Sequence, residues 1–141
     1  MIVEKAIAYI LNNTTSITAL VGNRIYNTFA PQGTALPYVT FTIAPGGVQP
    51  YDTKSTTQGG ADLDRVTFEI HSYAADSKSA AQIDETIRSV LDRHPAGAVN
   101  GVNLDGVRYV YTTKYPEPGE STDGGAVVMH YVSEYVVRVK Y

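Results

Sequence analysis

Apolar side chains follow a helical period in two parts of the chain. Near the N-terminus they recur at steps of three and four residues, at Ile2, Val3, Ala6, Ile7, Ile10 and Leu11. Between residues 77 and 93 the same steps return, at Ala80, Ile83, Ile87, Val90 and Leu91. An apolar stripe of this width is typical of a helix that packs one side against a core. We therefore predict two longer helices in these segments.

The second of these helices carries further signals. Asp76 stands just before it as an expected N-cap, because its carboxylate can accept a backbone N–H of the first turn. The polar positions of the helix are predicted to form a solvated face: Lys78, Asp84, Glu85, Arg88 and Asp92.

A shorter helix is expected between the first helix and the sheet. Thr14, Thr15 and Ser16 offer N-cap hydroxyls for a helix that runs through Ile17 and Leu20.

The connection that follows is predicted to turn sharply and then to run extended. Gly22 and Asn23 adopt positive φ at little cost, so the chain can turn into a short extended run at residues 24–26. Pro31 and Pro37 disfavour helical backbone at the residues before them. The path into the next strand is therefore expected to be extended.

Alternating apolar and polar residues predict the strands of a sheet. Residues 38–43 and 65–73 each place β-branched or aromatic side chains on one face and mainly polar ones on the other. Residues 107–113 and 126–141 are rich in valine and tyrosine. The last of these segments has no wholly polar side, which favours cover on both faces, one of them by another subunit.

These segments together predict one α+β domain over residues 1–141. We expect a mainly antiparallel sheet of four to five strands, with the two longer helices packed on one face and long hairpin loops that protrude. Asn100-Gly101 and Asp105-Gly106 are expected to form tight turns before the third strand.

Two stretches are too polar for a core. Residues 44–62 and 114–125 are rich in glycine and proline, and structureless connections of this length are usually functional or disordered. We interpret them as hairpin arms that become ordered against neighbouring proteins, with tolerated insertions as the alternative.

Composition narrows the class of protein. A chain of 141 residues, 43% of them hydrophobic, can bury a core without disulfides or metals. It contains no cysteine, which excludes a disulfide framework and a thiolate zinc site. The net charge of −3 and the scattered basic residues disfavour a protein whose main task is to bind nucleic acid. We expect no signal peptide and no membrane span, and hence a location in the cytoplasm of the producing cell.

Candidate catalytic groups are sparse. His71, His94 and His130 lack the spacing of a metal site, although His71 and His130 are adjacent if their strands pair. Asp62 and Asp64 would share a strand face, as paired carboxylates do in some enzymes. The sequence has no Walker or dinucleotide loop and no nucleophile elbow. We expect no cofactor, no metal and no enzymatic activity, and keep a small metal-dependent hydrolase as the least favoured alternative.

The chain is rich in tyrosine. It has 11 tyrosines and no tryptophan, and many of the tyrosines fall in the last two strands and the loop between them. Tyrosine joins a large apolar ring to a polar tip, which suits protein interfaces and also sugar stacking. We favour subunit contact, with a sugar- or peptide-binding module as the alternative.

One stretch between the first helices and the sheet carries a family resemblance. It reads Leu20-Val21-Gly22-Asn23-Arg24-Ile25-Tyr26, then Ala30-Pro31-Gln32-Gly33, then Leu36-Pro37-Tyr38. This stretch and the order of the elements around it resemble the tail-completion, or tail-terminator, family of long-tailed phages and prophages, across nearly the whole chain.

The resemblance implies a structural virion-assembly protein that caps the tail tube and joins it to the head connector. It implies a closed ring of this chain, with six copies, and the tail-tube and head-connector proteins as partners. DNA would meet the ring only by passing through it, and no membrane is involved. The protein would end in the virion, at the head–tail junction.

The resemblance carries no specific functional residue. Contact residues are therefore predicted from the polar arms and the tyrosines: Gly46, Gly47, Tyr51, Asp52, Lys54, Lys114, Tyr115, Glu117, Glu120, Tyr131 and Tyr135.

Overall fold

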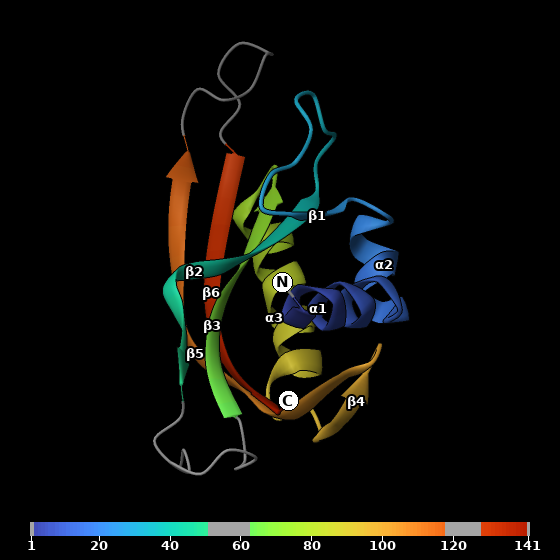
Figure 1. Cartoon of the computed structure of the whole chain (residues 1–141). Coiled ribbons are helices and arrows are strands. Elements are labelled where there is room, and N and C mark those ends of the chain that lie inside the picture. The colour runs from blue at the N-terminus through green and yellow to red at the C-terminus, as the bar shows by residue number, and fades with distance from the viewer. Residues whose placement is uncertain (1, 51–62, 118–127, 141) are drawn as a thin grey trace, which may run out of the picture.

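A computed structural model describes residues 2–50, 63–117 and 128–140 of the chain (Figure 1). Its helices are α1 (Ile2–Asn12), α2 (Thr15–Val21) and α3 (Ser77–Leu91). Its strands are β1 (Ile25–Asn27), β2 (Tyr38–Pro50), β3 (Leu63–Ala74), β4 (Gly97–Val99), β5 (Val102–Glu117) and β6 (Val128–Lys140).

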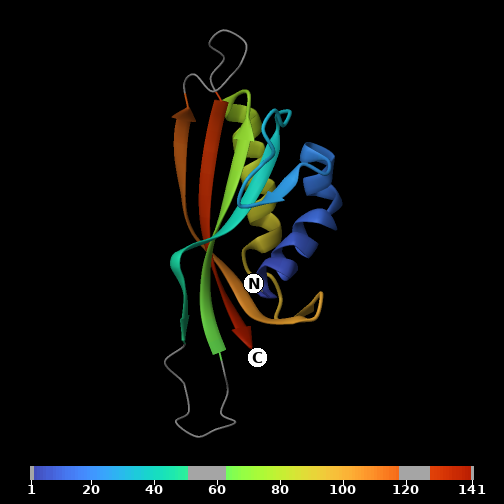
Figure 2. The same cartoon turned by 45° about the horizontal axis from the view of Figure 1, so that its top comes forward.

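The described strands form one six-stranded sheet in the order β1-β2-β3-β6-β5-β4. Neighbouring strands are antiparallel except β1 and β2, which are parallel. All three helices cover the same face of this sheet (Figures 1 and 2). The mixed α+β class is confirmed, but four to five strands was too few, because the three-residue strands β1 and β4 extend the two edges.

The core lies between the helices and the sheet. The predicted apolar stripes of α1 and α3 face the core. Ala6, Leu11 and Ile87 are at most 1% exposed, and Val90 is partly buried. On the sheet side, Phe68 and Tyr135 stack with their ring centroids 5.5 Å apart. The Tyr135 hydroxyl is buried without a hydrogen-bond partner among the described residues, and burial raises its pKa.

The start of α3 follows the prediction. Asp76 caps the helix, since the Ser79 backbone N–H donates to its carboxylate at 2.7 Å, and this hydrogen bond holds the Asp76 pKa below its ordinary value.

The predicted solvated face of α3 is wrong at Asp84, which is buried. The Ser133 hydroxyl donates to its carboxylate, and Thr112 lies 2.7 Å from Ser133 and 2.6 Å from the Tyr109 hydroxyl. The Arg88 guanidinium lies 3.8 Å from the Tyr109 ring centroid. A polar position on a helix can thus face the sheet where the sheet supplies hydroxyl partners.

The stretch predicted as a loop from residue 44 begins instead as strand. β2 runs on to Pro50 through an irregularity between Ile43 and Val48. A Cβ at Gly47 would lie 2.6 Å from the carbonyl oxygens of Ala44 and Thr67, so only glycine fits this close approach. Glycine here marks a bulge in a strand and not the start of a loop.

The two predicted turns have different outcomes. Asn100 and Gly101 form the β4–β5 turn with φ of 48° and 80°, as predicted. Asp105-Gly106 is not a turn, because it lies within β5, where the pairing with β6 shifts between Leu104 and Val107. β5 also continues through Lys114, which was assigned to the second polar loop.

We expect Gly47→Ala to lower the free energy of unfolding by about 2–3 kcal/mol, because the added methyl group must displace two backbone carbonyls. Gly46→Asn is the matched control, since Gly46 has φ of 66° and open space around its Cβ position, both of which asparagine tolerates. Denaturant unfolding of both variants measures the difference. Equal losses of unfolding free energy in the two variants would contradict the close approach at Gly47.

Asp84 is expected to make stability depend on pH. Burial raises its pKa above the ordinary value of 3.8, so its contribution is fully present below that value and is lost as pH rises through the folded-state pKa. Asp84→Asn keeps an oxygen acceptor for Ser133 and cannot ionise. The stability of this variant relative to wild type should therefore rise between pH 4 and pH 7, as measured by denaturant unfolding at each pH. A difference that stays constant over this range would be evidence against a buried, titrating Asp84.

Candidate functional site

The face of the sheet opposite the helices is the candidate site, and we call it the open face. Alternate residues of the four long strands point to it, as the strand register shows. Along the two central strands these are Arg65, Thr67, Glu69, His71 and Tyr73 on β3, and His130, Val132, Glu134, Val136 and Arg138 on β6. No described helix covers this face (Figure 2).

One end of the open face carries stacked rings. Tyr73 lies between Tyr38 and His130, with ring centroids 4.6 Å and 4.1 Å away. The ring of Tyr115, on β5, is tilted against the His130 ring, and the two ring centroids are 5.7 Å apart. These rings leave His130 only 7% exposed, although it lies on the uncovered side of the sheet.

His71 and His130 are adjacent, as predicted for paired strands. His71 Nδ1 lies 2.7 Å from His130 Nε2, and His71 Nε2 lies 3.0 Å from a carboxylate oxygen of Glu69. A hydrogen bond between two imidazoles needs one donor and one acceptor nitrogen, so the pair cannot be doubly protonated in this arrangement.

The arrangement does not assemble the hydrolase site that the sequence left open. Asp64 alternates with Arg65 on β3 and therefore lies on the other face of the sheet from His71. Asp62 lies outside the described residues. The described part of the chain contains no group of three metal-ligating side chains.

The middle of the open face is acidic. Glu69 and Glu134 are directly opposite each other on β3 and β6, and both are half-buried. Tyr111 faces Glu134 from β5, and the charge of Glu134, with a smaller effect of Glu69, raises the Tyr111 pKa.

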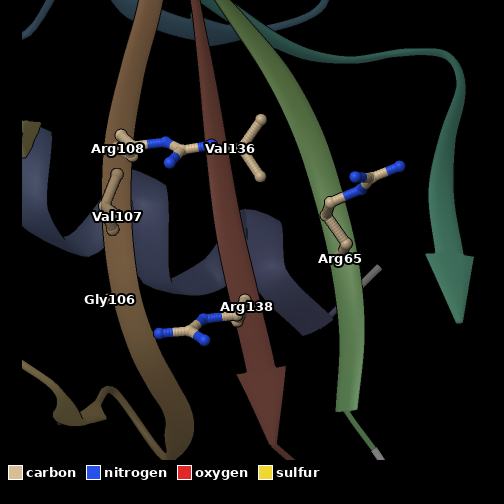
Figure 3. A pocket seen from close by; sticks show the side chains of 6 residues that line it. All are labelled: Arg65, Gly106, Val107, Arg108, Val136 and Arg138. Atoms are coloured by element: carbon tan, nitrogen blue, oxygen red, sulfur yellow. The ribbon is translucent and has the colours of Figure 1, made fainter. Parts of the chain in front are cut away.

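The other end of the open face is basic. Arg65, Arg108 and Arg138 line a shallow hollow of about 290 Å³ together with Gly106, Val107 and Val136, and we call it the arginine hollow (Figure 3). Arg108 and Arg138 extend across it from β5 and β6, whereas Arg65 points from β3 toward β2.

The contacts of these arginines within the described part of the chain are not evident from the order of the sequence. Arg138 lies 3.6 Å from the Asp105 carboxylate. Arg65 donates a hydrogen bond to the side-chain amide oxygen of Gln49, which is uncharged. Arg108 makes no hydrogen bond or ion pair within the described part of the chain. Arg65 and Arg138 are directly opposite on neighbouring strands, an arrangement in which like charges disfavour the sheet.

The residues predicted to contact partners are dispersed. Tyr115 is exposed on the open face, whereas Lys114 points to the helix side, 5.9 Å from the Tyr131 ring. Tyr131 is half-buried with its hydroxyl 3.2 Å from Ser77, and Tyr135 is fully buried and offers no surface.

The remaining predicted contacts lie on β2, at the end of β5, or beyond the described residues. Gly46 and Gly47 belong to the β2 irregularity, and Glu117 ends β5. Tyr51, Asp52, Lys54 and Glu120 lie outside the described residues.

Sequence reasoning missed the arginine hollow. Its three arginines are far apart in sequence, and only the strand register brings them together. It also missed Phe29, which is 81% exposed in the connection between β1 and β2. An apolar ring exposed to this extent suits a contact with another protein.

None of the described helices is long and apolar enough to cross a membrane.

Comparison with known proteins gives a family and a shared fold. A family model described as "Tail completion protein gp17" matches residues 5–133. No curated protein matches the chain. A chain in the virion of a native gene transfer agent particle is similar in structure, with a TM-score of 0.63 and 18% identity over 94% of this chain and 90% of that chain.

A second solved protein, which bears no functional name, gives a TM-score of 0.54 and 15% identity over 98% of this chain and 95% of the other. Identities this low establish the fold alone.

The histidine pair is expected to act as one unit in stability. His71→Ala and His130→Ala should each destabilise the protein, and the double variant should lose less than the sum, with a coupling of about 1 kcal/mol. His94→Ala serves as the control, because its described hydrogen bond is local, to the Pro95 carbonyl. Denaturant unfolding of the four variants tests this, and strictly additive losses would contradict the pairing.

Proposed function

This chain belongs to the tail completion protein gp17 family, and from that membership we propose that it caps the phage tail tube and joins it to the head connector. It is a structural component of a phage virion. The family match over residues 5–133 is the observation that carries the proposal. The similarity to a chain of a gene transfer agent virion supports it, because the two folds agree over 94% of this chain.

The subunits are proposed to close into a ring of six on the end of the tube. The two ends of the sheet differ, which supports contacts that join unlike surfaces. One end of the sheet holds Arg65 and the end of β6. The other end holds the start of β6 and the start of β2. Heterologous contacts of this kind form rings when the rotation between copies closes.

Assembly is proposed to begin in the host cytoplasm and to end with the protein at the head–tail junction. DNA would then pass through the ring without being bound, which the net charge of −3 supports.

The internally packed tyrosines favour this function over a sugar- or peptide-binding module, whereas Tyr9, Tyr111 and Tyr115 are exposed. Tyr38, Tyr73 and Tyr135 stack on rings of their own chain, and Tyr109 lies beneath Arg88. Rings that pack internally are not free to stack on a ligand.

The test of the function is binding to purified tail tubes that lack this protein. The wild-type chain should co-sediment with the tubes at a fixed ratio to tube ends. Phe29→Ser should weaken this binding about tenfold or more, since an exposed aromatic anchor is removed. Its melting temperature should stay close to that of wild type, because Phe29 is 81% exposed.

Tyr9→Ser is the matched control, because Tyr9 is also an exposed ring, 49% accessible, but lies on α1. Absence of wild-type binding to the tubes would refute the proposed function. Equal binding by the Phe29→Ser and wild-type proteins would refute only the role of Phe29.

A further inference from the structure

The arginine hollow has the properties of an anion-binding surface. Three guanidinium groups border it, and the residues that line it include no carboxylate. The Asp105 carboxylate lies 3.6 Å from Arg138, beside the hollow. An anion placed in the hollow would offset the repulsion between Arg65 and Arg138, and the planar fork of arginine suits a carboxylate.

The chain itself contains an acidic segment of matching character. Residues 117–123 include Glu117, Glu120 and Asp123 and no lysine or arginine. By contrast, residues 51–62, which join β2 to β3 at the hollow's own end of the sheet, include Lys54 as well as Asp52 and Asp62. The purely acidic segment is therefore the better complement to three arginines.

The acidic segment cannot reach the hollow of its own chain. Glu117 pairs with Val128 at one end of the sheet, whereas Arg138 lies ten residues further along β6. At about 3.3 Å per residue the two ends are roughly 30 Å apart. Glu117 and Val128 are paired at the far end, and the ten residues that join them allow a reach of at most about 17 Å from that end.

We propose that the arginine hollow of one copy binds the acidic segment, residues 117–123, of a second copy. This contact rests on the proposed ring and identifies one of its joints. Each subunit then presents an acidic surface at one end of its sheet and a basic surface at the other. The joint is heterologous, so every copy donates one acidic segment and receives another.

Duplex DNA is the less suitable occupant. Proteins that bind DNA through its phosphates spread basic residues along a stripe, and affinity grows with the number of phosphates neutralised. The open face instead changes from the arginines to the Glu69–Glu134 pair within four residues along β3. A short acidic peptide segment fits this small basic area better than a polyanionic rod.

Charge reversal tests the joint. The basic-end variant carries Arg65→Glu and Arg108→Glu, and the acidic-end variant carries Glu120→Lys and Asp123→Lys. Each variant alone should self-associate at least about tenfold more weakly than wild type, measured by sedimentation velocity at high concentration and on tail tubes. An equimolar mixture should recover the association, because each reversed end then meets a reversed partner.

A control variant with Lys5→Glu and Lys78→Glu has the same change of charge as the basic-end variant, but on the helices, and should associate like wild type. Circular dichroism and melting temperature verify that each variant is folded. The proposal is overturned if the basic-end variant associates like wild type, or if the mixture does not recover.

Two further outcomes would also overturn the joint. One is a wild-type chain that binds tail tubes but makes no contact between copies there, which would leave the proposed function intact. The other is a basic-end variant that loses binding to duplex DNA while it still self-associates. Failure of the wild-type chain to bind tubes would count against the proposed function, independently of the charge-reversed pair.

Discussion

The antiparallel pairing of β3 with β6 is the constraint on which the rest of the structure depends. It runs without a bulge from Leu63 opposite Lys140 to Ala74 opposite Met129. Because side chains alternate along a strand, this register decides at once which residues enter the core and which remain on the open face. A slip of one residue would move Phe68 away from Tyr135 and separate Arg65 from Arg138.

The two faces of these central strands, one toward the helices and one on the open face, have different roles. Toward the helices, the sheet supplies apolar side chains and a small set of hydroxyls that hold Asp84. Away from the helices it carries rings, acids and bases in succession, with few apolar residues. Stability therefore comes mainly from one side, and the other side is free to vary with the partner. Such a division suits a virion structural protein that must fold first and assemble afterwards.

Much of this fold could be predicted from the sequence, because its signals are local. The apolar stripe of α1, the Asp76 cap and the Asn100-Gly101 turn each depend on residues close together in the chain. Asp84 and the arginine hollow could not be predicted, since both depend on which strand lies beside which. Periodicity identifies the face of an element but not its neighbour, and a buried acid looks like an exposed one until its hydroxyl partner is known.

The two edges of the sheet have a consequence for the subunit before it contacts other copies. β1 and β4 are three residues long, so β2 and β5 extend past them, and no described strand pairs with their outer edges there. Along those stretches the strands are interrupted by bulges and by prolines such as Pro45 and Pro116. Interrupted edges are poor templates for strand addition. We therefore expect the free subunit to resist edge-to-edge strand addition between copies.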